Sequence, residues 1–165
     1  MLFVTVGTHE QQFNRLVKEI DDIKGSGVLG NEEIIMQTGY CTYKPTNCEC
    51  KPFFSYSEIE EFVSQARIVI CHGGPSSFIM PIQMRKIPIV VPRQSKFNEH
   101  INNHQCEFVK MVSERQKNII AIYNINDLCE IIKNYENIVL QMNVEIVNNN
   151  QRFNDRIEEI IHEMM

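Results

Sequence analysis

The stretch Ile68-Val69-Ile70-Cys71-His72-Gly73-Gly74-Pro75-Ser76-Ser77 decides the fold of this chain. Its apolar start predicts a strand over residues 67–71 that is buried on both faces of a sheet. The two glycines predict a tight turn, and Pro75 suits the first turn of a helix, which we expect over residues 76–84. A buried strand that runs through a glycine turn into a helix is typical of an open parallel sheet.

The same alternation of strand and helix continues on both sides of this stretch. Further strands are predicted at residues 2–6, 34–37, near 51–54, 89–91 and 119–122, and further helices at 11–24, from Ser57 onward, 99–112, 125–134 and 152–162, with an irregular loop at 40–50. Ser57 and Glu60 have the spacing of a capping box. The sequence therefore predicts an α/β fold, a Rossmann-like parallel sheet with helices on both faces. We expect one domain over residues 1–165, with a C-terminal helix within residues 150–165.

Composition narrows the classes of function. The formal net charge of -5 argues against a general nucleic-acid binder, because duplex affinity comes mostly from clustered Lys and Arg. No apolar run approaches the roughly 20 residues that span a bilayer, and the first residues run into a glycine turn instead of forming a secretory signal. We therefore expect a cytoplasmic protein with free thiols. Cys48 and Cys50 lack the second ligand pair of a zinc site, so no metal is expected.

Polar residues gather after three of the predicted strands, where ligands of open parallel sheets bind. The first group is Gly7-Thr8-His9-Glu10, the second runs from His72 to Ser77, and the third from Arg93 to Gln105. The glycine turn of the second group exposes backbone N–H groups at a helix N-terminus, which suits a pyrophosphate. The third group is rich in amides and imidazoles, which suit a sugar or a base. Each group also has a structural interpretation, as a turn, an N-cap or a solvated helix start.

Taken together and in this order, the three groups resemble a known family. The matching residues are Phe3 to Gln11 with Phe13, His72 to Pro75, Pro88 to Arg93, Glu99-His100 and Asn103 to Gln105. From Met1 to about Ile132 the sequence resembles the C-terminal, donor-binding domain of family 28-type glycosyltransferases with the GT-B fold. It is similar to small single-domain members from bacterial capsule and exopolysaccharide clusters. Those members are similar to the catalytic subunit of the eukaryotic two-part N-acetylglucosaminyltransferase of dolichol-linked glycan synthesis.

The resemblance implies half of an enzyme that transfers a hexosyl residue from a nucleotide sugar, with uridine diphosphate as the carrier by family analogy. It implies a membrane-anchored partner subunit that binds the acceptor, a lipid-linked saccharide at the inner face of the membrane, and it implies no cofactor and no metal. The residues that it assigns to the nucleotide sugar are Gly7, Thr8, His72, Gly73, Gly74, Ser76, Ser77, Arg93, Glu99, His100, Asn103, His104 and Gln105. Glu10 and His9 are its candidates for the general base, unless the partner supplies that group.

One position departs from the family pattern. Larger relatives carry a Glu for the ribose hydroxyls seven residues before the proline of the next strand, and here that position is Pro81. The nucleotide identity therefore stays open, with Gln83 or backbone groups as substitutes. Two other functions also stay open. One is a non-catalytic binding or accessory subunit of a similar complex. The other is a Rossmann dehydrogenase or epimerase, against which the missing Gly-x-Gly-x-x-Gly fingerprint after the first strand argues.

Overall fold

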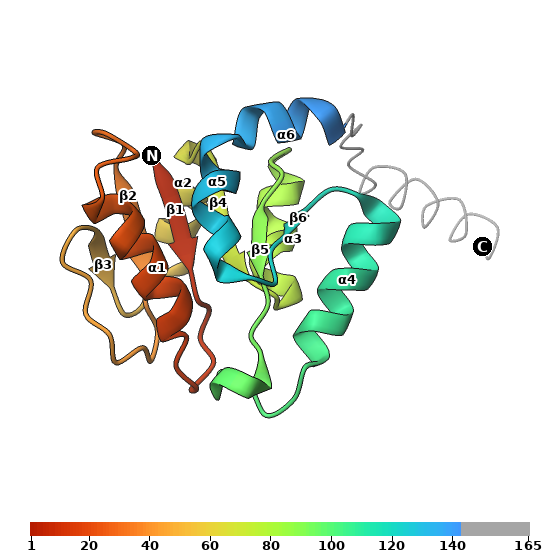
Figure 1. Ribbon diagram of the computed structural model, residues 1–165, viewed down its shortest axis with the longest axis horizontal. Coiled ribbons are helices and arrows are strands. Elements are labelled where there is room, and N and C mark those ends of the chain that lie inside the picture. The colour runs from red at the N-terminus through yellow and green to blue at the C-terminus, as the bar shows by residue number, and fades with distance from the viewer. Residues whose placement is uncertain (143–165) are drawn as a thin grey trace, which may run out of the picture.

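The computed structural model describes residues 1–142 and contains one sheet of six parallel strands (Figure 1). The strands are β1 Leu2–Thr5, β2 Ile34–Gln37, β3 Glu49–Lys51, β4 Ile68–His72, β5 Ile89–Val91 and β6 Ile120–Ala121. Their order across the sheet is β3-β2-β1-β4-β5-β6. Strands β1, β2, β4 and β5 are buried along their whole length, which explains their continuous apolar runs.

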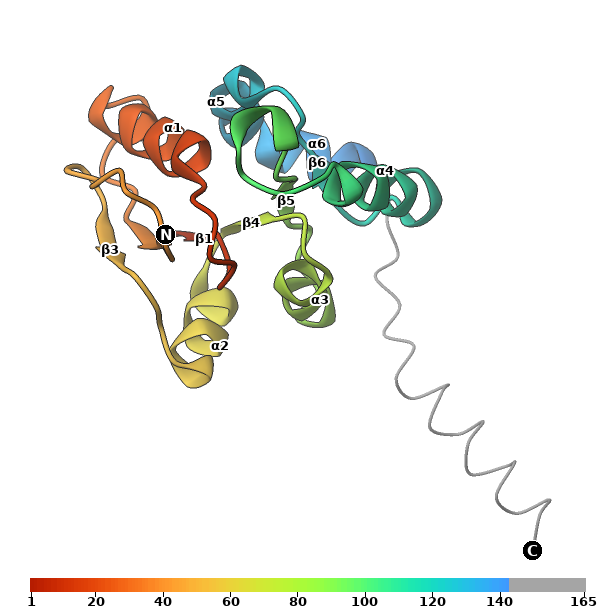
Figure 2. The same ribbon diagram turned by 90° about the horizontal axis from the view of Figure 1, so that it is seen from below.

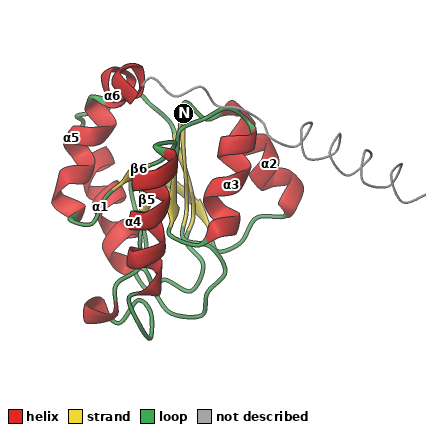
Figure 3. Ribbon diagram, turned by 90° about the vertical axis from the view of Figure 1, so that its right-hand side faces the viewer, coloured by secondary structure: helices red, strands yellow, loops and turns green. Residues whose placement is uncertain are grey.

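Helices cover both faces of the sheet (Figures 2 and 3). They are α1 Asn14–Gly25, α2 Tyr56–Gln65, α3 Pro75–Gln83, α4 His104–Gln116, α5 Leu128–Lys133 and α6 Tyr135–Met142, with short 3-10 helices η1 Ser95–Phe97 and η2 Ile125–Asp127. The residues of α1, α5 and α6 share one apolar core with one face of the sheet, and those of α2, α3 and α4 pack on the other face. The predicted Rossmann-like α/β architecture is therefore confirmed.

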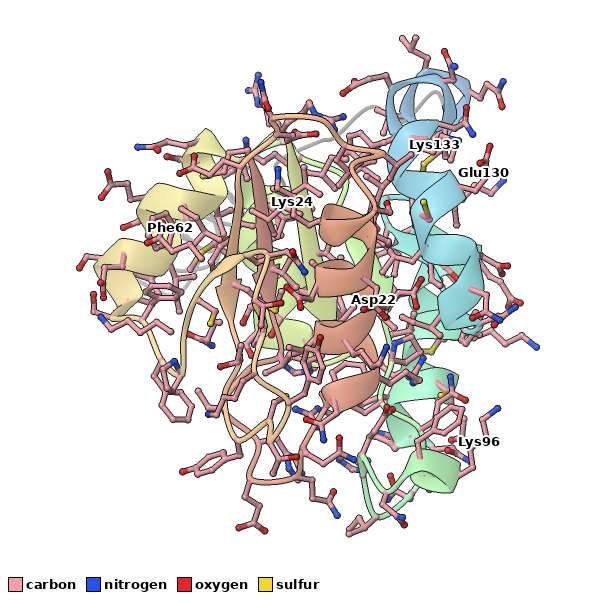
Figure 4. All side chains as sticks on the ribbon, turned by 60° about the vertical axis from the view of Figure 1, so that its left-hand side comes forward. Asp22, Lys24, Phe62, Lys96, Glu130 and Lys133 are labelled. Atoms are coloured by element: carbon pink, nitrogen blue, oxygen red, sulfur yellow. The ribbon has the colours of Figure 1, made fainter. Side chains whose placement is uncertain are left out.

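The order of the strands reverses direction between β1 and β4. The chain leaves β1 toward β2 on one side, whereas β4, the other neighbour of β1, leads to β5 and β6 on the opposite side. Loops that leave the carboxyl ends of these two strands therefore diverge, and ligands of open α/β sheets bind at such a point. In Figure 4 the carboxyl ends of the strands lie at the bottom, where Lys96, which follows β5, is labelled, and Glu130 and Lys133 of α5 lie toward the top.

Two predicted helices begin at the wrong residue, and each error has a local cause. Helix α1 begins at Asn14 and not at Gln11, because Gln11 N donates a hydrogen bond to His9 Nδ1 (3.1 Å) and stays in the loop. The capping box of α2 consists of Ser55 and Glu58, with both reciprocal hydrogen bonds present. The predicted pair two residues later lies inside the helix.

The helix predicted over residues 99–112 is wrong in its first part. Asn98 has a φ of 56°, in the left-handed region, and the chain then turns until α4 begins at His104. Helix α6 was not predicted from the sequence. Its first residue, Tyr135, is buried and donates a hydrogen bond to the Ile87 carbonyl oxygen (2.7 Å). The C-terminal helix expected within residues 150–165 lies outside the described residues.

Candidate functional site

The three polar groups of the sequence meet at the carboxyl ends of β1, β4 and β5. The loop after β1 contacts the loop after β4, because Gly7 lies against the His72 ring. The loop after β4 contacts α4, because Gly73 lies against the side chain of Gln105. The loop after β1 also meets the turns before α4, where the ring centroids of His9 and His100 are 5.0 Å apart. Segments that are distant in the sequence are thus brought into contact, although no residue of the third group lines the pocket described below.

Two glycines of the site enclose one imidazole. A Cβ atom at Gly7 would lie 2.2 Å from His72 Nε2, and a Cβ atom at Gly74 would lie 2.3 Å from His72 Cε1. Gly7 also has a φ of 75°, which side chains rarely tolerate. Packing against His72 is therefore sufficient to require both glycines, whether or not a ligand approaches their backbone.

His72 is only 9% exposed, and both of its ring nitrogens have partners in the protein. Gly74 N donates to Nδ1 (2.9 Å), and Nε2 lies 2.7 Å from Ser77 Oγ. Burial of the ring, and then the nearby Arg93 guanidinium, lower the pKa of His72 to about 4. The imidazole is therefore neutral at pH 7 and joins the glycine turn to the first turn of α3.

The Arg93 side chain is fully buried, and its hydrogen-bond partners are groups of the protein itself. Its guanidinium donates to four carbonyl oxygens, with Nη1 bound to those of Gln11 (2.8 Å), Gln12 (3.0 Å) and Glu99 (3.1 Å) and Nη2 to that of Val6 (2.9 Å). The resemblance assigned Arg93 to the nucleotide sugar, but the structure places it behind the surface. There it fixes the loop after β1 to the loop after β5.

Glu99 was also assigned to the nucleotide sugar and is also fully buried. It accepts two hydrogen bonds from Arg15, from Nε (2.8 Å) and Nη2 (2.9 Å), and one from Gln94 N (3.0 Å). Its carboxylate is thus engaged by protein groups. Arg15 was missed at the sequence level, because a single Arg in an amphipathic helix is usually a solvent-exposed residue.

The rest of the third group divides into two residues whose amides bond to neighbouring loops, the exposed Asn103 and the half-buried Gln105, and two histidines. Asn103 Oδ1 accepts hydrogen bonds from Ser95 N and Ser95 Oγ (both 3.0 Å), and Gln105 Oε1 accepts one from Arg93 N (3.1 Å). These two amides hold the turns before α4. His104 is exposed on the first turn of α4, and His100 is half-buried beside the loop after β1.

The two candidates for the general base differ in their surroundings. His9 is half-buried, and burial followed by the charge of Arg93 lowers its pKa. Glu10 is exposed at the tip of the loop after β1. Within residues 1–142, the Glu10 carboxylate has no hydrogen-bond or ion-pair partner, so it is free to meet a second molecule.

A pocket of about 410 Å³ opens between α2, α3 and the end of β1. Its lining residues are Phe3, Thr5, Gly7, Thr8, His9, Gln37, Tyr56, Ile59, Val63, His72, Ser76, Ser77 and Met80. Six of these were predicted site residues: Gly7, Thr8, His9, His72, Ser76 and Ser77. The volume lies in the range of small-molecule sites, roughly 300–1,000 Å³.

The pocket residues that sequence reasoning missed come from the strands, from α2 and, in the case of Met80, from α3. Gln37 ends β2, and its Nε2 donates to Thr5 Oγ1 (3.1 Å) at the end of β1. A polar residue that ends a buried strand was the available signal for both residues. Tyr56 is exposed on the first turn of α2, and nothing in its sequence context distinguishes it from a surface residue.

Helix α3 offers no carboxylate to the pocket. Its sequence, PSSFIMPIQ, contains no acidic residue. Pro81, the position of the expected Glu, is buried, and its neighbour Met80 lines the pocket instead. Gln83, considered as a substitute, is exposed and is not among the lining residues.

Among residues 1–142, no group of three or more His, Cys, Asp and Glu side chains is arranged to hold a metal ion. None of the helices in this range is both long enough and apolar enough to cross a membrane.

Sequence comparisons place the chain among known proteins. The profile of the family described as "Glycosyltransferase family 28 C-terminal domain" matches residues 1–141. The chain is also similar to the UDP-N-acetylglucosamine transferase subunit ALG13 of Mus musculus, at 31% identity over 118 residues. This match covers 67% of the chain and 10% of the mouse protein, so the chain spans about a tenth of the length of that relative.

Comparison with solved structures gives a consistent result for the fold. The glycotransferase of kitacinnamycin matches with a TM-score of 0.53 and 14% identity, over 96% of this chain and 42% of that chain. The glycosyltransferase SnogD from Streptomyces nogalater matches with a TM-score of 0.46 and 11% identity, over 73% of this chain and 30% of that chain. The first of these shows a shared fold that accounts for less than half of the longer protein.

Proposed function

Because the chain belongs to the glycosyltransferase family 28 C-terminal domain family, we propose that it is the donor-binding, catalytic subunit of a two-component glycosyltransferase. It binds a uridine diphosphate sugar and transfers the hexosyl residue to a lipid-linked saccharide in capsule or exopolysaccharide synthesis. The mouse relative is named as a subunit of a UDP-N-acetylglucosamine transferase, which supports both the nucleotide and the need for another subunit.

The observation that carries this proposal is the pocket beside the N-terminus of α3. Ser76 and Ser77 line it from the first turn of that helix, next to the Gly73-Gly74 turn. Pro75 has no N–H and Ser77 N donates to the Gly74 carbonyl oxygen (3.0 Å), so Ser76 supplies the N–H of this first turn that can face a ligand, and the helix dipole places partial positive charge there. Together these groups suit a diphosphate, and they stabilise the charge that develops on it as the glycosidic bond breaks. The apolar end of the pocket, with Phe3, Ile59 and Met80, suits the flat face of a base.

Glu10 is the general base in this proposal. Its carboxylate is exposed on the loop after β1, where an acceptor hydroxyl held by another subunit can reach it. His9, on the same loop, lines the pocket and contacts the nucleotide sugar. The membrane-anchored partner supplies the acceptor side and holds this chain at the cytoplasmic face of the membrane.

Calorimetric titration of the purified chain with UDP-sugars, alone and with the partner subunit, tests donor binding. We expect Ser76→Ala and His104→Ala to weaken binding by about tenfold each, as the loss of one hydrogen bond to a charged group predicts. Ser64→Ala, on the exposed surface of α2, is the matched control. Absence of heat with every nucleotide sugar tested, with the partner present, would contradict the proposal.

A transfer assay with Glu10→Gln then separates a catalytic subunit from a binding subunit. We expect turnover to fall by 10²-fold or more with UDP-sugar affinity retained, because general acid–base catalysis contributes about 10²–10⁴-fold. Unchanged turnover would show that Glu10 is not the general base.

A further inference from the structure

Three of the four histidines assigned to the site, His9, His72 and His100, share one hydrogen-bond pattern. In each, Nδ1 accepts from the backbone N–H two residues later, from Gln11 N to His9 (3.1 Å), from Gly74 N to His72 (2.9 Å) and from Asn102 N to His100 (3.4 Å). A backbone N–H can only donate. In the neutral ring, therefore, Nδ1 carries the lone pair and Nε2 carries the proton.

This tautomer assigns the direction of the short contact at α3. With the proton on Nε2, His72 donates to Ser77 Oγ over 2.7 Å. The Ser77 oxygen then accepts from the ring, and the hydroxyl hydrogen of Ser77 is left to donate elsewhere. Within residues 1–142, His72 is the one hydrogen-bond partner of Ser77 Oγ, and Ser77 lines the pocket.

We propose that His72 is a positioning residue that turns the Ser77 hydroxyl hydrogen into the pocket without itself touching the ligand. Hydrogen bonds run in one direction, from Gly74 N–H to His72, from His72 to Ser77, and from Ser77 to a ligand oxygen. The identity of that ligand, a diphosphate, rests on the proposed function; the chain of hydrogen bonds does not.

The surroundings of the ring keep this arrangement in place. Gly7 and Gly74 lie so close to the imidazole that neither has room for a Cβ atom, so the ring is held between two loops. Burial also keeps the ring neutral, since it lowers the pKa of His72 to about 4. A protonated ring would present N–H groups at both nitrogens and would lose the bond from Gly74.

Two substitutions of His72 separate its two hydrogen bonds. In His72→Asn, the amide oxygen can accept from Gly74 N–H as in an Asx turn, but no atom reaches Ser77. In His72→Gln, the longer side chain can place an N–H group near Ser77, and the bond from Gly74 is weakened. A role limited to the turn and a role in positioning Ser77 therefore predict opposite rankings of the two variants.

Titration with UDP and with inorganic pyrophosphate tests the proposal. We expect Ser77→Ala and His72→Asn each to weaken binding by about tenfold or more, and His72→Gln to weaken it less. The double variant should bind no more weakly than Ser77→Ala alone, because both changes remove the same interaction. Ser64→Ala serves as the control. Wild-type affinity in His72→Asn would overturn the proposal. Additive losses in the double variant would also overturn it, because additivity indicates that His72 contacts the ligand directly.

A measurement without ligand keeps the two proposals distinguishable. Nitrogen NMR of the histidine-labelled chain at pH 7 should show His72 protonated at Nε2 and not at Nδ1. Protonation at Nδ1 would overturn the positioning role, whatever the chain binds. If neither probe binds to the wild-type chain but the Nε2 tautomer is present, the proposed function fails and the hydrogen-bond direction stands.

Discussion

Replacement of Gly7 with Ala measures how tightly the loop after β1 closes on His72, and Gly27 provides a matched control. Both glycines have a φ of 75°, so both alanine variants place a side chain in the same left-handed conformation. Their surroundings differ. A Cβ atom at Gly7 would lie 2.2 Å from His72 Nε2 and 2.6 Å from His72 Cδ2, whereas nothing lies within 4 Å of the equivalent atom at Gly27.

The expected losses follow from these two conditions. Left-handed strain costs about 1–2 kcal/mol in either variant. The smaller conformational freedom of the unfolded chain offsets about 0.4–1 kcal/mol of it. Gly27→Ala should therefore lower the free energy of unfolding by about 1 kcal/mol. Gly7→Ala must also displace a buried ring, which adds about 1–3 kcal/mol and gives a total of about 2–4 kcal/mol.

Urea unfolding of the two variants, and of each with His72→Ala, is the assay. Removal of the imidazole makes room at position 7, so the loss from Gly7→Ala should fall in the His72→Ala background to about that of Gly27→Ala. The loss from Gly27→Ala should not change. Equal losses for the two glycines, or a Gly7→Ala loss that is the same in both backgrounds, would refute the packing of the loop against His72.

Three further predictions concern other parts of the site and the fold. Arg93→Met should lower the free energy of unfolding by about 3–5 kcal/mol in urea, because four carbonyl oxygens lose their donor and two of these bonds are buried. Arg67→Met, at an exposed ion pair, should lower it by about 1 kcal/mol or less. Similar losses in the two variants would contradict the internal role of Arg93. Ser55→Ala should lower the free energy of unfolding, measured by thermal melting, by about 1 kcal/mol, and Ser57→Ala by less, because Ser55 is the N-cap of α2. The reverse ranking would indicate that Ser57 is the N-cap, as the sequence predicted. The pKa of His72 is about 4 in the folded chain and about 6.5 in the unfolded chain, so the unfolded chain binds more protons between these two values. The free energy of unfolding should therefore fall as the pH falls through this window, and it should fall less in His72→Asn. Parallel pH profiles for the two proteins would show that another group is responsible.

The sheet was predictable because its central strands are buried on both faces. Runs such as Ile68 to Cys71 need no alternation, and each is followed by a turn signal, so their number and order along the chain could be read directly. Helix starts were less predictable, since Ser55-x-x-Glu58 and Ser57-x-x-Glu60 fit the same capping pattern. The way in which α2 packs on the sheet decides which of the two overlapping capping boxes forms.

The helix predicted over residues 99–112 failed because apolar spacing does not report burial. Ile101, which supported that helix, is 81% exposed, whereas Glu99 is fully buried against Arg15. A buried ion pair between residues 84 positions apart leaves no local pattern. The charged residues of the third group were therefore assigned to a ligand when two of them, Arg93 and Glu99, stabilise the loops from inside.

In the proposed function, the buried Arg93 contributes to diphosphate binding through its charge, without touching the ligand. Burial is the main cause that lowers the pKa of both His9 and His72, and the charge of Arg93 is the second, so its field reaches two residues that line the pocket. Salt screens a buried charge much less than a surface charge, because mobile ions cannot approach it closely. The buried guanidinium and the N-terminus of α3 can thus make the pocket locally attractive to a diphosphate in a chain whose net charge is -5. In this proposal the charge and the contact are separate. Neutral hydroxyl groups of Ser76 and Ser77 donate the hydrogen bonds, and the buried cation attracts the anion and also fixes the loop that carries Thr8 to Glu10.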